Sequence, residues 1–325
     1  MRGLFPSVLL LLSCATPGSP DGSSTPHEPM TVSVGGWSVV PGLTPARCVV
    51  VRLPNDVPAF VTSVRARLGP AGHHVTLLRT DETEERPEPF DCTAFGDVLG
   101  GATQPLVISQ VPDDTLTLPP GVGFRLGVHQ MVKIEAHFLD TGTAPVVADA
   151  SVTLTWTDPP VDGVSASMGF YGFTDLAIPS GGEWSTPWSF VPVPTATRVF
   201  GVSAHTHAMG TNVEVERAQS AAVAGERLYP GVVPFDYRAP PVAHLAPAAV
   251  FASGDGLRYR CTWTNTSGKT AVFGDEMCLF WAYEYPSDAY HVCMNDAAGS
   301  VQCCPGAGCT SLAPILMAGA KRDPD

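Results

Sequence analysis

The sequence has few charged side chains, and positive ones are the scarcest. Asp, Glu, Lys and Arg make up 15% of its 325 residues, with 18 Lys plus Arg against 31 Asp plus Glu, so the formal net charge is -13 at pH 7. Such a chain lacks the positive surface that holds nucleic acid or an anionic membrane. We therefore expect no nucleic-acid partner and no electrostatic membrane binding.

Long apolar runs are also missing. The run from Val8 to Leu12 is far shorter than a membrane span and follows Arg2, which is typical of a signal-peptide core and not of a transmembrane helix. It leads into Leu11-Leu12-Ser13-Cys14, which is similar to the cleavage and lipidation box of a bacterial lipoprotein. Residues 1–13 would then be removed and Cys14 would carry the lipid. An ordinary signal peptide cut slightly later is the alternative.

A lipidated Cys14 predicts a protein anchored in a bacterial cell envelope, facing the periplasm or the exterior. Nine cysteines fit such an oxidising compartment, and lipidation leaves an even number, eight, for disulfides. Residues 14–30 are rich in Ser, Pro, Gly and Thr and have no apolar period. They are typical of a flexible tether.

No stretch has a convincing helical period, whereas glycine and proline, 32 of each, divide the chain into short apolar segments. This pattern predicts an all-β protein of two consecutive antiparallel β-sandwich domains of jelly-roll type. A Pro- and Asp-rich break at 158–163 separates an N-terminal domain, 31–160, from a C-terminal domain, 161–325. The clearest strands are expected at 31–34, 48–53, 59–68, 74–79, 131–139, 150–156, 198–205, 213–217, 259–263 and 278–285.

Five of the nine histidines fall in three places: His73-His74, His137 and His205-Thr206-His207. On a strand, His205 and His207 would share one face about 7 Å apart and could reach one metal ion, although such a pair is as often solvated or part of a core. His73 and His74 would point to opposite faces. They could bind one ion if the backbone bends, which Gly72 would permit, or if one ring coordinates through Nδ1 and the other through Nε2.

These histidines belong to a longer pattern that resembles the copper type II, ascorbate-dependent monooxygenases, the family of peptidylglycine α-hydroxylating monooxygenase and dopamine β-monooxygenase. The intervals are 63 residues from His74 to His137, 68 from there to His205 and 72 from there to Met277. The resemblance covers roughly residues 45–293. The matching segments are Leu53-Pro54, Gly72-His73-His74, 118–124, Glu135-Ala136-His137-Phe138, His205-Thr206-His207 with Gly210, Arg260-Cys261 and Asp275-Glu276-Met277-Cys278.

The resemblance implies two mononuclear copper ions, one in each domain, facing a solvent-filled cleft between the domains. The first would be held by His73, His74 and His137 and would deliver an electron. The second would be held by the catalytic residues His205, His207 and Met277, where dioxygen is activated and a substrate C–H bond is hydroxylated. Imidazole suits copper in both oxidation states, and a soft thioether favours Cu(I). An electron donor such as ascorbate would reduce both ions.

The resemblance also implies two disulfides, Cys48–Cys92 and Cys261–Cys278. Cys293 corresponds to a family half-cystine whose partner is missing here, so we expect it to pair within the cluster Cys303, Cys304 and Cys309. The connectivity is open, and metal binding by the four cysteines, Cys293 together with this cluster, is the alternative.

The substrate, a small molecule or a peptide, is not identified by the sequence. The positions with which the peptide-hydroxylating branch grips a carboxylate correspond to Ser203, Leu279 and Trp281, so we do not expect carboxylate recognition. Leu279 and Trp281 would form either an apolar substrate wall or ordinary core, and Met277 too could be a core residue. Two other functions stay open: a non-catalytic copper-binding lipoprotein of the envelope, and a metal-free binding module.

Overall fold

The structure is a computed structural model that describes residues 25–100, 103–194, 196–231 and 234–305. Within these ranges the chain forms 24 strands and one short helix, α1 (Gly96–Gly100), which confirms the expected all-β class. In the same ranges, no helix is long and apolar enough to cross a membrane. The predicted signal peptide and the lipidation site Cys14 lie outside the described residues.

The N-terminal half forms two sheets packed face to face around an apolar core. Its strands are β1 (Met30–Val39), β2 (Ala46–Arg52), β3 (Ala59–Leu68), β4 (Gly72–Thr80), β5 (Arg86–Asp91), β6 (Thr103–Ser109), β7 (Asp113–Thr117), β8 (Val122–Leu126), β9 (Met131–Phe138), β10 (Val146–Thr157) and β11 (Val164–Ser165). One sheet has the order β1-β10-β3-β8-β11, with β7 also paired to β3. The other has the order β5-β2-β9-β4-β6.

The C-terminal half repeats this plan with its own core. Its strands are β12 (Ser167–Phe173), β13 (Ala177–Ile178), β14 (Gly182–Ser185), β15 (Ser189–Pro192), β16 (Arg198–His205), β17 (Gly210–Ala218), β18 (Glu226–Tyr229), β19 (Ala243–Val250), β20 (Gly256–Asn265), β21 (Ala271–Val272), β22 (Leu279–Tyr285), β23 (His291–Asn295) and β24 (Val301–Pro305). One sheet has the order β19-β16-β22-β12-β23-β24 and the other β14-β20-β17-β18, with β15 on β20 and a separate β13-β21 ribbon.

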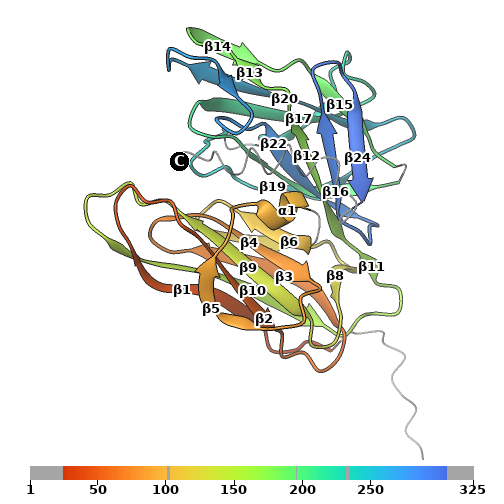
Figure 1. The fold of residues 1–325 in the computed structure, drawn as a ribbon. Coiled ribbons are helices and arrows are strands. Elements are labelled where there is room, and N and C mark those ends of the chain that lie inside the picture. The colour runs from red at the N-terminus through yellow and green to blue at the C-terminus, as the bar shows by residue number, and fades with distance from the viewer. Residues whose placement is uncertain (1–24, 101–102, 195, 232–233, 306–325) are drawn as a thin grey trace, which may run out of the picture.

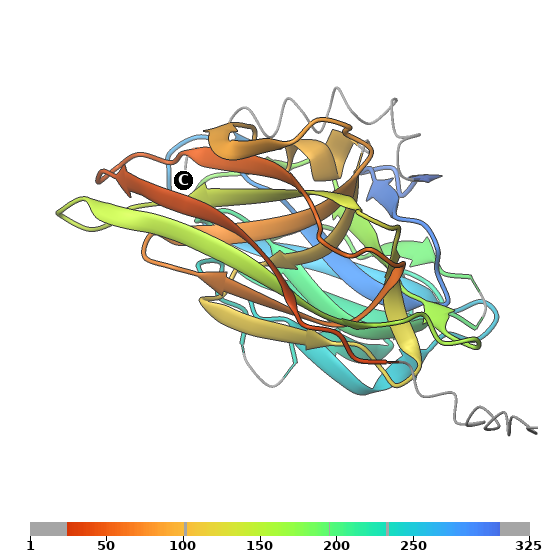
Figure 2. The ribbon, with the colours of Figure 1, turned by 90° about the horizontal axis from the view of Figure 1, so that it is seen from below.

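The burial patterns show which sheets face solvent. In β10, buried residues alternate with more exposed ones, as expected for a strand with one face on the core. In β9 and β12 every residue is buried, so both faces of these strands are covered. Figures 1 and 2 show the reason, because the sheet of β4, β6 and β9 lies between the outer N-terminal sheet and the C-terminal half.

The two halves meet through a buried apolar interface. Phe170, Trp281 and Tyr283, on the outer face of the β12–β22 pair, belong to the same hydrophobic cluster as the N-terminal core. The backbone N–H of Ile108 donates to the hydroxyl of Tyr283 (3.2 Å), and the hydroxyl of Tyr290 donates to the carbonyl of Val98 in α1 (2.8 Å). The apolar side chains here therefore fill space that the resemblance assigned to a solvent-filled cleft.

Every one of the ten expected strands coincides with a strand of the structure, but three details differ from the sequence expectation. The pairs β8–β11 and β12–β23 are parallel and not antiparallel. Val164 and Ser165 pair with the N-terminal sheet although they follow the expected domain break. Residues before β1 also make contacts, since His27 stacks on Trp156 with ring centroids 4.0 Å apart and donates a hydrogen bond to Asp158 (2.9 Å).

Candidate metal centre

The first histidine set lies on the neighbouring strands β4 and β9. The register of this pair shifts between Gly72 and His74, as at a β-bulge, and His74 lies opposite His137. The bulge is the local bend for which Gly72 was suited, and it lets His73 and His74 turn to the same side. The ring centroids are 5.0 Å apart for His74 and His137, and 5.5 Å for His73 and either of the other two.

The second set lies where β16 ends. His205 is the last residue of that strand, and His207 is in the following turn, which the N–H of Gly210 closes by donating to the carbonyl of His207 (3.0 Å). The expectation that both histidines lie on one strand face is therefore wrong for His207. The turn nevertheless brings the two rings to 5.2 Å between centroids. Met277 lies two residues before β22 (Leu279–Tyr285), whose first residue Leu279 pairs with His205, and the side chain of Met277 is buried.

The two histidine sets meet across the domain interface. The rings of His73 and His205 are 6.4 Å apart between centroids, and none of the five histidines is more than 8% exposed. The resemblance had implied two sites separated by solvent. In this structure the five imidazoles form one buried group, because the sheets that carry them pack directly against each other.

Phe95 packs against this group of histidines, and the sequence did not indicate it. It has a positive φ of 54°, its N–H donates to the Oε1 of Glu135 (2.6 Å), and its ring stacks on His74 with centroids 4.2 Å apart. Its ring also lies 5.3 Å from that of His205. Burial raises the pKa of Glu135 to about 8, mainly because a charge there would be poorly solvated. Phe95 comes from a loop with no recognisable pattern, so only the fold could identify it.

Glu276 connects the turn after β16 to the segment that carries Met277. Its carboxylate is buried and accepts hydrogen bonds from the backbone N–H groups of His207 (2.9 Å) and Met209 (2.7 Å) and from the indole of Trp263 (2.9 Å). The Nδ1–H of His207 donates to the carbonyl of Asp275 (3.1 Å). Met277 is thus covalently adjacent to the groups that fix the His207 ring, as expected for outer residues that orient ligands.

Gln110 makes the corresponding contact to His205 from the other half of the chain. It directly follows β6, is 3% exposed, and its amide contacts both the Nδ1 of His205 and the carbonyl of Ala204, each at 2.8 Å. No motif had singled out this residue.

The ring nitrogens are suited to a metal ion. Burial, followed by the charges of the neighbouring histidines, lowers the pKa values of His74 and His205 well below the usual range, so both rings are neutral at pH 7. Among the described residues, His74 has no hydrogen-bond partner at either nitrogen and His205 has none at Nε2. An unsatisfied buried polar group costs about 1–3 kcal/mol, and a coordinated cation would satisfy it. Imidazole rings together with a thioether are a donor set that copper accepts.

The candidate ligands are not arranged around a common point in this structure. In the described part of the chain, no three His, Cys, Asp or Glu side chains are arranged so that they could hold one metal ion as they stand. The chemistry of the residues therefore fits copper, while the rings would have to turn for their nitrogen atoms to meet at one point.

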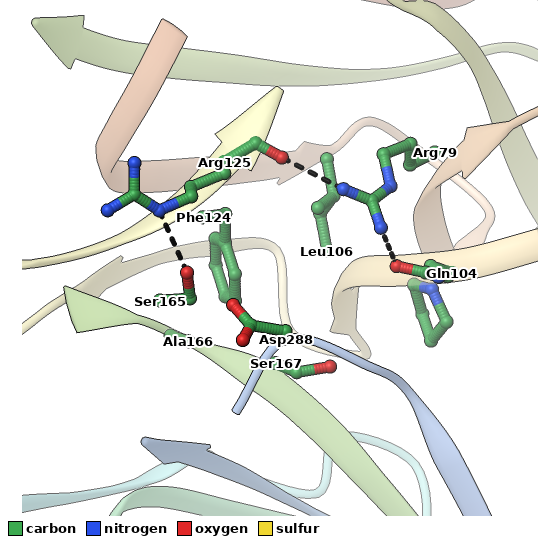
Figure 3. A pocket seen from close by; sticks show the side chains of 10 residues that line it. Arg79, Gln104, Leu106, Phe124, Arg125, Ser165, Ala166, Ser167 and Asp288 are labelled. Atoms are coloured by element: carbon green, nitrogen blue, oxygen red, sulfur yellow. Dashed lines mark hydrogen bonds between the residues drawn. The ribbon is translucent and has the colours of Figure 1, made fainter. Parts of the chain in front are cut away.

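A separate cavity of about 180 Å³ lies at the junction of the halves and is shown in Figure 3. Arg79 reaches over it and donates a hydrogen bond to the carbonyl of Arg125 (3.0 Å), and Arg125 donates to the hydroxyl of Ser165 (2.9 Å). Asp288 also lines it. None of the six candidate copper ligands does, so this cavity is distinct from the candidate metal centre.

The expected disulfides Cys48–Cys92 and Cys261–Cys278 are both present and confirm those predictions. The second joins β20 to the residue after Met277, which restrains the segment carrying that methionine. Cys293 pairs with Cys303, so it does find its partner within the local cluster, and Cys309 lies outside the described residues.

Comparison with known proteins supports the resemblance for the C-terminal half. Residues 191–302 match the family model described as the C-terminal domain of the copper type II ascorbate-dependent monooxygenases. This range includes His205, His207 and Met277, whereas the first histidine set precedes it. No curated protein matches the chain.

Among solved structures, the chain resembles the major capsid protein P2 of bacteriophage PM2, with a TM-score of 0.30 and 10% identity. The alignment covers 78% of this chain and 97% of the capsid protein. The likeness is too distant to bear on function.

Proposed function

We propose that the chain is a copper-dependent monooxygenase that hydroxylates a substrate C–H bond with dioxygen and an external one-electron reductant such as ascorbate. The observation that carries the proposal is the buried group of five imidazoles, in which the Nε2 of His205 and both nitrogens of His74 have no hydrogen-bond partner among the described residues. The family match over residues 191–302 supports the same chemistry.

In this proposal His73, His74 and His137 bind one copper ion, and His205, His207 and Met277 bind the other. When bound, copper would supply one-electron transfer and the activation of dioxygen. The chain itself holds the rings in place: Asp275 accepts the Nδ1–H of His207, and Glu276 fixes the backbone on either side of that ring. The disulfide at Cys278 restrains Met277. The buried surroundings exclude water and lower the pKa values of His74 and His205, which keeps these two rings neutral.

Access to this group requires movement, because the five histidines and Met277 are at most 8% exposed. Leu279 and Trp281 are also buried, in the cluster that joins the two halves. We therefore propose that substrate and reductant reach the ligands when the halves separate along this interface. Leu279 and Trp281 would then become an apolar wall, which favours a hydrophobic substrate.

The same enclosure favours a second candidate, a non-catalytic copper-binding protein of the envelope. A buffer needs no substrate access, and the closed interface would suit it. Two chemically different ligand sets in separate halves are, however, more than buffering requires. For both candidates we propose that lipidated Cys14 anchors the protein to the envelope.

The decisive experiment is copper loading and desalting, followed by ascorbate-driven oxygen uptake with aromatic amines, amidated or free peptides, and small aliphatic compounds. We expect two copper ions per chain, and one after either His137→Ala or His207→Ala. His27→Ala, which belongs to neither set, is the control and should retain both. Copper binding without substrate-coupled oxygen uptake would favour the non-catalytic candidate. Absence of copper would contradict both.

A further inference from the structure

The side chain of Gln110 is a buried amide of the N-terminal half, and it makes two hydrogen bonds with residues of the C-terminal half. Gln110 follows β6 in the N-terminal half, while Ala204 and His205 are the last residues of β16 in the C-terminal half. Both contacts are 2.8 Å, and Gln110 is 3% exposed. A buried amide is retained at such a place only if its polar atoms are used, because an unpaired one would be costly.

The direction of these hydrogen bonds follows from the chemistry of the groups. The carbonyl of Ala204 can only accept, so the NH₂ group of Gln110 must face it. The carbonyl oxygen of Gln110 then faces the Nδ1 of His205, and since that oxygen is an acceptor, Nδ1 must carry the proton. In a neutral imidazole the lone pair consequently lies on Nε2. Only this orientation of the amide lets Gln110 donate to Ala204, because the reverse orientation would place two acceptor oxygens against each other.

We propose that Gln110 is a positioning residue that fixes the Nδ1–H tautomer of His205 and so presents its Nε2 lone pair to the second metal ion. The part of this proposal that concerns the metal rests on the proposed function, whereas the tautomer itself does not. Residues that orient a metal-ligating histidine in this way commonly change metal affinity by about 10–100-fold when replaced.

The proposal ties the two halves of the chain together. Gln110 can hold His205 only while β6 and β16 are docked, so the second ligand set is fully ordered only in the closed arrangement. Movement of the halves that admits a substrate would also release His205 from its partner. Copper bound at His205 should therefore favour the docked arrangement, and docking should favour copper, by the same factor.

The test begins with the metal-free full chain labelled with ¹⁵N-histidine, in which ring ¹⁵N shifts report each tautomer and the His205 signals are assigned with His205→Gln. Gln110→Met keeps the length of the side chain but removes both polar atoms. Gln110→Glu keeps an acceptor for Nδ1–H. Gln104→Met is the matched control, since Gln104 lies on β6, which Gln110 follows, but accepts its hydrogen bond from Arg79. Melting temperatures establish that each variant is folded.

We expect only the Nδ1–H form of His205 in the unaltered chain, in Gln104→Met and in Gln110→Glu, and a mixture containing Nε2–H in Gln110→Met. An unchanged tautomer in folded Gln110→Met would overturn the proposal. If Gln110→Met does not fold, the Nδ1–H form in Gln110→Glu supports the proposal, and its loss there overturns it.

Chelator competition then measures copper affinity at each set. Gln110→Met should weaken the second copper by about 10–100-fold and leave the first unchanged. Equal affinity at the second set would overturn the metal part of the proposal. If the unaltered chain bound no copper, the proposed function and this metal part would both fail, while the shifts of His205 would still decide whether Gln110 fixes its tautomer.

Discussion

Met277 is the residue on which the two interpretations of the C-terminal half differ most. It is 2% exposed and lies in an apolar cluster, as a core methionine would, yet it also occupies the ligand position of the family pattern. Replacing it with Ile keeps its apolar character and approximate volume and removes the sulfur, which should cost less than about 1.5 kcal/mol of stability. We expect substrate-coupled oxygen uptake to collapse while the first copper is still reduced by ascorbate. Melting temperature, Cu(II) spin resonance and oxygen uptake measure these effects.

Met294→Ile provides the matched control for Met277→Ile. Met294 lies in the same hydrophobic cluster and is 3% exposed, so the two substitutions make a similar change in packing. Similar oxygen uptake in both variants would show that Met277 is only a core residue. Loss of uptake in Met277→Ile alone would support its role as a ligand.

The ligand candidates were predictable from the sequence, but the residues around them were not. His73, His137 and Met277 carry residue types and intervals that can be compared with a known pattern. Gln110 and Phe95 act through contacts with residues far along the chain, Ala204 and His205 for one and His205 for the other. Such contacts exist only after the two halves dock, so no local pattern contains them.

The bulge in β4 sets the direction of the first ligand set and depends on Gly72. A Cβ atom at this position would lie 2.8 Å from the Cβ of Leu68, which is closer than real contacts allow, and 3.0 Å from the carbonyl oxygen of Gly69, which is a tight contact. Gly72→Ala should therefore force the backbone to shift, lower stability by about 1–3 kcal/mol and displace His73. We expect loss of the first copper and retention of the second, measured by metal analysis and thermal unfolding.

Gly127→Ala is the corresponding control for the bulge. A Cβ there would meet only the side-chain oxygen of Gln130, at 3.5 Å, which is an ordinary contact. This variant should keep both copper ions and a nearly unchanged melting temperature. Retention of the first copper in Gly72→Ala would contradict the importance of the bulge.

The strands themselves were well predicted, because Pro- and Gly-bounded apolar segments have few other structures open to them. The exceptions lie where the chain departs from a regular strand. His207 reads as a continuation of β16 by residue type, but Glu276 binds the backbone N–H groups of His207 and Met209 and stabilises a turn instead. The parallel pairs β8–β11 and β12–β23 depend on which strands become neighbours in a sheet. Strand positions predicted from the sequence do not specify these neighbours.

At the scale of the molecule, the resemblance led us to expect open space between the domains where the structure has an apolar interface. The sequence could not reveal this, because Phe170, Trp281 and Tyr283 lie on buried strands whose two faces are both apolar. Either face could belong to an internal core. Which face of these strands forms the interface is determined by how the sheets of the two halves pack against each other.

Anchoring is a property of the whole molecule that the proposed lipidation predicts. Cys14→Ser should move the protein from the membrane fraction to the soluble fraction of the cell envelope, because the acidic surface offers no electrostatic binding to anionic lipid. Fractionation followed by immunoblotting measures the distribution. Cys309→Ser, another cysteine outside the described residues, is the control and should stay with the membrane. Continued membrane association of Cys14→Ser would contradict the lipid anchor.

Docking of the two halves should depend on pH through His244 of β19 and Asp114 of β7. The Nε2–H of His244 donates to Asp114 (3.1 Å), and this hydrogen bond raises the pKa of His244 despite its partial burial. A histidine whose pKa is higher when folded stabilises the fold fully below its ordinary value of about 6.5, and this contribution is lost as the pH rises through the raised value. The metal-free chain should therefore lose this increment of stability as the pH rises above about 6.5.

Because the side chain of His244 is 42% exposed, solvent screens the pair and the increment should be below about 1 kcal/mol, equivalent to at most about 4 °C in melting temperature. Asp114→Asn removes the charge that raises the pKa of His244, so its difference in stability from the unaltered chain should be largest near pH 6 and should shrink as the pH rises. Asp56→Asn, at an exposed position, controls for the general loss of an acidic side chain. If the stability difference between Asp114→Asn and the unaltered chain did not change with pH, the contact between His244 and Asp114 would act only through packing. Protonation of His244 would then not strengthen the closed arrangement on which the buried histidine group depends.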